Sequence, residues 1–561
     1  PDPLFADPSL LGEGTDWQSE VFRTAPVLNH QLTLLGGSEK SRYSIGAGYF
    51  SQEGTIIGSD FDRYSLRINL DSDIKRWLSI GNSLALTKTD ERLGAFDRYG
   101  IINTALRARP DVPARNFDGT YAGVHGEGAF VNPLAQALDK ENYLKRATLV
   151  GNLYADIKII KALTFRTEIG GNGELNNSSS WNPTYDYGGG AVNDHNSISR
   201  QSGQSYSWQF KNYLTFNHQF ASIHNVNLMV GQEATEWGWN SVSGAGRDLP
   251  TNDVHSIDLG DPKQFITSDA SSSGALESYY GRFNYNYSEK YYATFTYRAD
   301  GSGNFAAGNR WGYFPSAALA WRLTNEPFFE PLTSVVSDLK LRASWGKTSN
   351  AGNQGGFKYG ETLSTLPTNL GLGFRYSNYG NPDFTWETSE QIDLGMDAAF
   401  LNNRMTLSFD YYDKTVTNLI IQMQLPGYMG TIGNGAILRS APWGNFGKLE
   451  NKGFDIAISS KNLTGKFQWD TDINISRNQN KLLDLGAEDA FLSGNIGAAG
   501  NVLVSRTEAG QAIGSFYGYQ VAGVFQDKDD ILNSPVQWDP VNDVDTDGNP
   551  VLTRDGTVWP G

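Results

Sequence analysis

The sequence predicts an all-β protein, a transmembrane antiparallel β-barrel with short periplasmic turns and long extracellular loops. Apolar and polar residues alternate along many short segments, which is typical of strands with one apolar and one polar face. Short and long connections alternate between those segments, as they do in outer-membrane barrels. A continuous run of about 18 apolar residues does not occur, so no membrane-spanning helix is expected.

The clearest strand pair lies in residues 279–298. Every second residue from 279 to 287 and from 291 to 297 is apolar, aromatic or small, and the residues between them are mostly polar. With residues 288–290 as the turn, we expect these cross-strand pairs: Tyr287 with Tyr291, Tyr285 with Ala293, Phe283 with Phe295, and Gly281 with Tyr297. The tyrosines at the strand ends are expected in the aromatic girdle at the membrane interface.

The other strands show the same alternation. They are expected at about residues 31–36, 43–49, 64–71, 77–86, 148–158, 163–170, 206–216, 224–232, 317–323, 339–345, 391–400, 405–411, 454–458 and 467–475. With the hairpin above, this makes about sixteen strands before the pattern fades near residue 478. Closing such a sheet into a barrel gives every strand edge a partner, which a bilayer requires.

Long loops are expected on one side of the sheet, and two of them carry prominent aromatic residues. Trp181, Tyr185 and Tyr187 follow the strand that ends near residue 170, and Trp237 and Trp239 follow the strand that ends near residue 232. Flat aromatic rings stack on sugar rings, but they also pack loops or hold a partner protein. These five residues are therefore candidate substrate-binding residues, with loop packing as the alternative for each.

Composition narrows the function. The formal net charge of −16 argues against a nucleic acid partner, and the absence of cysteine excludes disulfides and thiolate metal sites. The six histidines are scattered without the spacing of metal ligands, and no Gly-x-Ser-x-Gly nucleophile motif occurs. We therefore expect neither an enzyme nor a bound cofactor.

One acidic segment near the C-terminal end could bind Ca²⁺. Asp543, Asp545 and Asp547, followed by Gly548, have the alternating carboxylates that wrap oxygen atoms around this ion. The twelfth position of the pattern is Arg554 rather than the glutamate that closes such a loop. A Ca²⁺ site and a solvated acidic loop are both compatible with the segment.

Several segments resemble the barrel of SusC-like TonB-dependent transporters (the RagA/SusC family), the nutrient importers of the Bacteroidetes outer membrane. The most recognisable block spans residues 298–305 and 309–316, with Trp321-Arg322-Leu323 after it. The family-motif residues in this block are Asp300, Gly301, Ser302, Arg310, Trp311, Gly312, Phe314 and Pro315. Similar segments also occur at residues 14–17, 339–346, 386–387 with Gln391, 410–415, 451–455, and 517–519 with 523–525.

The resemblance implies the architecture and the partners. It implies a barrel of 22 strands in the outer membrane of a Gram-negative bacterium, with residues 1–561 forming part of it. The plug domain, the TonB box and the last strands are then expected outside this sequence. The resemblance also implies two protein partners: a SusD-like surface lipoprotein at the outer mouth, and TonB with its inner-membrane proton-driven complex, which acts through the N-terminal part.

The expected function is TonB-dependent import of a nutrient, an oligosaccharide, across the outer membrane. Import of peptides, vitamins or metal chelates is an alternative within the same class. A surface binding protein or adhesin without a transport cycle is an alternative from another class. The identity of the substrate and the stoichiometry with the lipoprotein do not follow from the sequence.

Overall fold

The structure of the chain is a computed structural model. It describes residues 12–94, 100–123, 131–187, 190–351, 357–423, 425–430, 439–486, 490–496, 502–518, 520–521, 523–524 and 526. The chain divides into two compact units, residues 1–480 and 481–561. The second unit contains a three-stranded sheet of β23 (Ala490–Ile496), β24 (Val502–Glu508) and β25 (Ser515–Phe516).

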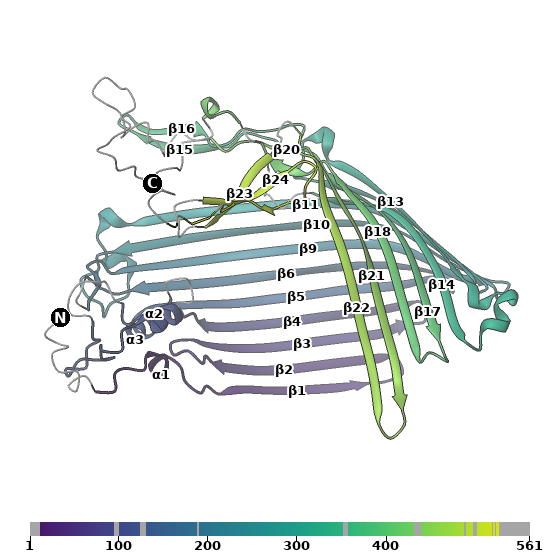
Figure 1. Cartoon of the computed structure of the whole chain (residues 1–561), viewed down its shortest axis with the longest axis horizontal. Coiled ribbons are helices and arrows are strands. Elements are labelled where there is room, and N and C mark those ends of the chain that lie inside the picture. Colours follow the sequence, from purple (N-terminus) through teal and green to yellow (C-terminus); the bar gives the residue numbers. More distant parts are fainter. Residues whose placement is uncertain are drawn as a thin grey trace. The chain divides into compact units, whose positions relative to one another are not determined.

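A sixteen-stranded antiparallel sheet, in which strands follow one another in chain order, dominates the fold (Figure 1). Its strands are β1 (Val27–Gly37), β2 (Ser41–Glu53), β3 (Asp60–Lys75), β4 (Leu78–Arg92), β5 (Glu141–Ile160), β6 (Leu163–Asn182), β9 (Ser197–Phe220), β10 (His224–Arg247), β11 (Ile266–Tyr287), β12 (Tyr291–Ser302), β13 (Trp311–Arg322), β14 (Val336–Asn350), β17 (Glu387–Phe400), β18 (Met405–Thr417), β21 (Lys448–Thr464) and β22 (Gln468–Asp484). This confirms the predicted all-β class and the sixteen strands. Within the described residues, β1 and β22 are the edges of the sheet.

The register of the β11–β12 hairpin is the predicted one. Tyr287 pairs with Tyr291, and Phe283 pairs with Phe295. Ser288 and Glu289 have positive φ angles of 52° and 55°, and the N–H of Lys290 donates to the carbonyl of Tyr287 at 2.9 Å. Two consecutive residues with positive φ form the type I′ turn whose twist matches that of paired strands.

Connection lengths alternate along the sheet as predicted. Short turns occupy residues 38–40, 76–77, 161–162, 221–223, 288–290, 401–404 and 465–467. One connection on the same side is longer than these turns, as its predicted strand bounds required, because residues 323–335 form the 3₁₀ turns η6 (Leu323–Asn325) and η7 (Pro327–Leu332). Three short helices lie on the other side of the sheet: α1 (Trp17–Val21), which precedes β1, and α2 (Ile101–Arg107) and α3 (Pro133–Leu138), which lie in the β4–β5 connection.

Further short elements occur in the long connections. They are the strands β7 (Tyr185–Asp186), β8 (Val192–Asn193), β15 (Leu363–Thr368), β16 (Gly371–Tyr376), β19 (Ile420–Gln422) and β20 (Trp443–Asn445), and the 3₁₀ turns η3 (Ile257–Leu259), η4 (Pro262–Gln264), η5 (Ala307–Asn309) and η8 (Gly427–Met429). The strands pair as β7–β8, β15–β16 and β19–β20. None of the helices in the described ranges is long and apolar enough to cross a membrane.

The sheet has one apolar and one polar face. The pairing register places Leu66 beside Leu86, and Leu86 beside Leu149, in adjacent strands. The same face continues through Phe283 and Phe295 to β13 and beyond. Many of these large apolar side chains are exposed rather than packed in a core. A continuous exposed apolar face on a sheet is the arrangement that a bilayer covers.

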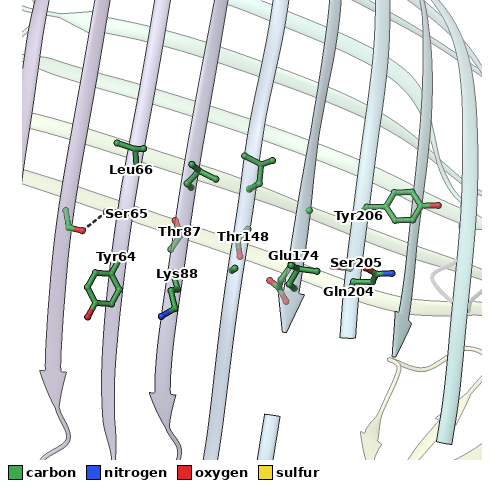
Figure 2. A pocket seen from close by; sticks show the side chains of 16 residues that line it. Tyr64, Ser65, Leu66, Thr87, Lys88, Thr148, Glu174, Gln204, Ser205 and Tyr206 are labelled. Carbon is green, nitrogen blue, oxygen red and sulfur yellow. Dashed lines mark hydrogen bonds between the residues drawn. The ribbon is translucent and has the colours of Figure 1, made fainter. Parts of the chain in front are cut away.

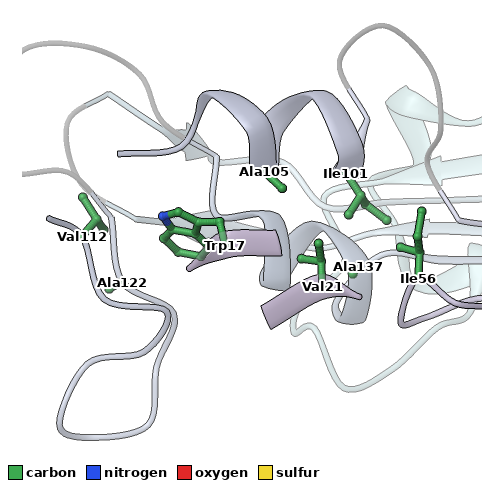
Figure 3. Packing of buried hydrophobic residues seen from close by; sticks show 8 residues of the cluster. All are labelled: Trp17, Val21, Ile56, Ile101, Ala105, Val112, Ala122 and Ala137. Carbon is green, nitrogen blue, oxygen red and sulfur yellow. The ribbon is translucent and has the colours of Figure 1, made fainter. Parts of the chain in front are cut away.

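The buried apolar clusters lie mostly in the connections. In one cluster, Trp17 and Val21 of α1 pack with Ile101 and Ala105 of α2 and with Ile56 (Figure 3). The side chain of Asp16 caps α1 by accepting hydrogen bonds from the next backbone N–H groups. The long connections are therefore packed structures in their own right, and they can hold side chains at fixed positions.

Candidate functional site

Ion pairs fix side chains on the polar face of the sheet. The Nε atom of Arg298 lies 2.7 Å and 3.0 Å from the two carboxylate oxygens of Asp300. Arg342 lies between two carboxylates, with Nε 2.8 Å from Asp397 Oδ2 and Nη2 2.9 Å from Asp410 Oδ1. The bidentate geometry of guanidinium groups gives such pairs a defined orientation. The polar face is therefore an ordered wall.

A hollow of about 650 Å³ opens on this face, across β12, β13, β14, β17 and β18. Its lining includes cations, a carboxylate, several hydroxyls, an amide and an aromatic ring, among them Arg298, Lys414, Asp300, Thr296, Ser316, Gln391 and Phe314. Its volume falls within the range of about 300–1,000 Å³ that is typical of ligand pockets. The hollow can hold a polar ligand that offers hydroxyl, carbonyl or carboxylate groups.

Small residues leave the room for this hollow. Ser316 pairs with Gly346, and Ala318 pairs with Ser344, in adjacent strands. This site was not predicted from the sequence. The sequence does carry a sign of it, because the polar face has small residues at alternate positions 316, 318 and 320 of β13 and at 344 and 346 of β14.

The family-motif residues tie the connection between β12 and β13 to other loops. Phe305 is fully buried (0% exposed), and its ring centroid lies 5.4 Å from that of Phe384 and 5.0 Å from that of Trp386. Trp386 also packs edge-on against Phe314, and its Nε1 donates to the carbonyl of Arg310 at 3.0 Å. These four residues, Phe305, Phe314, Phe384 and Trp386, form what we call the aromatic cluster.

The rest of the motif supports this packing. A Cβ atom at Gly301 would lie 3.0 Å from the ring of Trp311, and a Cβ atom at Gly312 would lie 2.3 Å from the ring of Phe314. Ser302 accepts a hydrogen bond from a backbone N–H through its hydroxyl, and Asp300 holds Arg298. Pro315, opposite Tyr297, precedes the first residue of β13 that pairs with β14. The motif therefore has a structural role.

Asparagine side chains join the long connections further. Asn309 Nδ2 donates to the carbonyl of Pro382 at 3.1 Å, which links the β12–β13 connection to the β14–β17 connection. Asn445 Nδ2 donates to the carbonyl of Thr385 at 2.7 Å, which adds the β18–β21 connection. These bonds and the aromatic cluster hold three connections together on one side of the sheet.

Trp181 does not lie in an open loop. It belongs to β6 and is only 4% exposed, and its ring stacks on that of His255 with centroids 4.1 Å apart. Ile198 and Leu249 complete its surroundings. The prediction of a loop position was wrong because β6 extends past the apolar part of the sequence. The surroundings of Trp181 favour the packing alternative over a ligand contact.

Tyr185 and Tyr187 pack on each other. Their rings are stacked with centroids 4.5 Å apart, and Tyr187 meets Tyr121 edge-on at 6.2 Å. Burial raises the pKa of Tyr187 and of Tyr121, and burial also raises the pKa of the carboxyl group of Asp139 beside them. Arg115 lies over the ring of Tyr121 at 4.3 Å. This geometry again favours loop packing.

Trp237 and Trp239 lie in β10 rather than in a loop, so the predicted loop at residues 233–276 is largely strand. Their position in the strand places both on the polar face, opposite in phase to Leu228. They are 38% and 47% exposed. Of the five aromatic candidates, these two have rings free to meet a ligand.

The remaining predicted site lies outside the described residues. Asp543, Asp545 and Asp547 fall in the segment from residue 527 onward, for which no structure is described. Among the described ranges, no cluster of three or more His, Cys, Asp or Glu side chains is arranged to hold a metal ion. The Ca²⁺ hypothesis therefore stays a prediction.

Comparison with known proteins identifies the family. The family model described as TonB dependent receptor-like, beta-barrel matches residues 8–550. The chain belongs to this family. The family consists of outer-membrane β-barrels of Gram-negative bacteria, so the apolar face of the sheet is the face that meets the bilayer, and the predicted location is confirmed.

Individual relatives agree with this assignment. The chain is 34% identical over 530 residues to TonB-dependent receptor P3 of Formosa agariphila, covering 91% of the chain and 51% of the relative. It is 28% identical over 559 residues to TonB-dependent receptor SusC of Bacteroides thetaiotaomicron, covering 91% of the chain and 53% of the relative. The chain thus spans about half the length of these relatives, and the SusC-like resemblance is confirmed.

Solved structures confirm the fold. The chain superposes on a structure of the RagAB peptide importer in its closed-closed state with a TM-score of 0.80 at 24% identity, covering 96% of the chain and 58% of the solved chain. A second RagAB structure, titled as a peptide transporter, gives a TM-score of 0.79 at 23% identity, covering 92% of the chain and 56% of the solved chain.

Proposed function

We propose that the chain forms part of the barrel wall of an active importer that moves a nutrient, an oligosaccharide, across the outer membrane. The observation that carries the proposal is the hollow of about 650 Å³ on the polar face, lined by hydroxyls, an amide and a ring. Such groups exchange hydrogen bonds with sugar hydroxyls, and the exposed rings of Trp237 and Trp239 offer stacking surfaces on the same face.

The full protein would act with partners. We propose a SusD-like surface lipoprotein at the side of the long connections, where the aromatic cluster gives three connections a fixed shape. We also propose energy supply by TonB through a plug domain and TonB box in the rest of the protein. Family membership and the similarity to SusC support both proposals.

A peptide cargo is the second candidate. The RagAB structures are titled as a peptide importer and a peptide transporter. In the hollow, Lys414 has no ion-pair partner among the residues that the structure describes, and a peptide carboxylate would supply one. Both cargoes would occupy the same hollow, so uptake must be measured with both.

A pair of neighbouring substitutions tests the proposal. Ala318→Leu adds a side chain inside the hollow, whereas Ala317→Leu adds the same side chain beside Phe295 on the bilayer face. Bacteria that produce the full-length variants are supplied with fluorescent oligosaccharides or peptides, with and without a proton uncoupler. We expect Ala318→Leu to lower uptake of one cargo about tenfold, the equivalent of 1.4 kcal/mol of lost binding, and Ala317→Leu to leave it unchanged.

Other outcomes reject parts of the proposal. Uptake that survives the uncoupler, or binding without uptake, would favour the surface binding protein over the importer. Equal uptake by the two variants would show that the hollow does not meet the cargo. If Ala318→Leu lowers the uptake of peptides but not of oligosaccharides, the cargo is a peptide and not an oligosaccharide.

A further inference from the structure

A second hollow lies on the opposite, apolar face of the sheet. It has a volume of about 820 Å³ and crosses β3, β4, β5, β6 and β9 (Figure 2). Leu66, Leu86, Leu149 and Leu175 project from this face and line it. An apolar hollow on the surface that meets the bilayer is open to acyl chains, whereas the hollow on the polar face is open to water.

Two small residues form the floor of the apolar hollow. Ala147 and Leu175 are cross-strand neighbours, as are Gly173 and Leu149. A Cβ atom at Gly173 would have only the carbonyl oxygen of Ser205 nearby, at 4.0 Å, so a larger side chain there would enter open space. The depth of the hollow therefore comes from the choice of these small residues between leucines, and a larger side chain would fill it.

The hollow crosses from apolar to polar surroundings. Tyr64 and Lys88 lie together at one end and Leu66 lies further along (Figure 2). The Nζ atom of Lys88 lies 5.7 Å from the ring centroid of Tyr64 and 2.9 Å from Asp90 Oδ2. Gln204 and Tyr206 lie on the far side of the same hollow. An amphiphile placed here would have its tail among leucines and its polar head beside an ammonium group.

Two ammonium groups at the polar end offer hydrogen-bond donors to an anionic head group. Asp90 takes one hydrogen-bond donor of the Lys88 ammonium group, and an ammonium group has three. Lys145, the cross-strand neighbour of Asp90, is exposed and adds a second cation on the same face. Asp62, the other cross-strand neighbour of Asp90, lies on the same face, so the polar end has two cations and two carboxylates. Each carboxylate already accepts a hydrogen bond, Asp62 from the Tyr49 hydroxyl at 3.0 Å and Asp90 from Lys88. The two ammonium groups keep further donors that a phosphate can accept.

The position along the strands identifies the leaflet. Tyr64 and Lys88 lie near the ends of β3 and β4 that lead to the long connections at residues 54–59 and 93–140. Long connections are extracellular in outer-membrane barrels. We propose that this hollow is a lipid site that binds one acyl chain of a phosphorylated glycolipid of the outer leaflet, with the phosphate at Lys88.

Native mass spectrometry of the full-length protein tests the site. The protein is purified in detergent, heat modifiability confirms that each variant is folded, and lipid A or phosphatidylethanolamine is added as the probe. Gly173→Leu fills the floor, and Ala293→Leu places the same side chain on the bilayer face of β12, outside the hollow. We expect the wild-type protein to retain one molecule of lipid A. The affinity for this lipid should fall about tenfold in Gly173→Leu and stay at the wild-type level in Ala293→Leu.

The polar end has its own test. Lys88→Gln keeps the hollow but removes the charge, so we expect weaker retention of lipid A and equal retention of its dephosphorylated form. Retention of lipid A by Gly173→Leu at the wild-type level would overturn the proposal. Preference for phosphatidylethanolamine, or protection of position 173 by a second copy or a partner protein, would also overturn it. None of these outcomes depends on the cargo or on import.

Discussion

The aromatic cluster should set the local stability of the long connections. Phe305→Ala removes a fully buried ring that contacts Phe384 and Trp386. Truncation of a buried phenylalanine to alanine costs about 3–5 kcal/mol. Because each 1.4 kcal/mol is tenfold in an equilibrium constant, local opening of the connection should become about a hundredfold or more easier.

Hydrogen exchange measures this effect directly. The backbone N–H of Ser302 donates to the carbonyl of Arg310 across the connection, and its protection should fall in Phe305→Ala. The matched control is Phe357→Ala, because Phe357 lies in the neighbouring connection and is mostly exposed. The amides of β1 and β2 should keep their protection in both variants. Unchanged protection at residues 302–310, or an equal loss in β1 and β2, would refute the structural role of the motif.

Three other substitutions follow from the same structure. Arg342→Ala removes the cation between Asp397 and Asp410, which are both partly exposed, and should cost about 1 kcal/mol in denaturant unfolding. Arg67→Ala, on the same face, should cost less; equal effects would contradict the ion-pair argument. Trp181→Ala should lower stability by about 3–5 kcal/mol, while Trp239→Ala should spare stability and weaken cargo binding; the reverse pattern would contradict the placement of the two rings. Burial raises the pKa of Asp139 above 3.8, so the charged form of this side chain is disfavoured in the folded loop. The local stability of the loop should therefore be highest below pH 3.8 and should decline as the pH rises through the raised pKa. Asp139→Asn should abolish this decline in pH-corrected hydrogen exchange, and a decline that persists would assign it to another group.

The sheet and its register could be predicted because the information is local. The period-two pattern defines which residues share a face, and the three-residue turn at 288–290 leaves one register for the hairpin at Tyr287 and Tyr291. The same logic produced the alternation of connections. It fails where a strand has no apolar face to mark it.

The ends of the strands could not be predicted for that reason. β9 and β10 are each 24 residues long, so they continue past the apolar band into a region where both faces are polar or aromatic. A pattern built on alternation reads such a region as a loop. Trp237 and Trp239 were therefore assigned to a loop, although they belong to a strand and share its polar face.

Tertiary contacts determine whether the other aromatic candidates are buried or exposed. Trp181 is buried because Asn196 holds the neighbouring connections together, accepting the backbone N–H of Leu249 at 2.6 Å and donating to its carbonyl at 3.1 Å. These contacts join residues far apart in the chain. The sequence around Trp181 contains no sign of them.

The central claim is that one face of the sheet meets lipid and the other lines an aqueous interior. The chain has no cysteine, so single nitroxide labels can be placed at Phe295→Cys and Thr296→Cys in the full-length protein in bilayers. Collisions with dissolved oxygen report lipid, and collisions with a water-soluble nickel chelate report water. We predict that position 295 meets oxygen and excludes nickel, and that position 296 meets nickel. The same response at both positions, or the opposite one, would contradict the account.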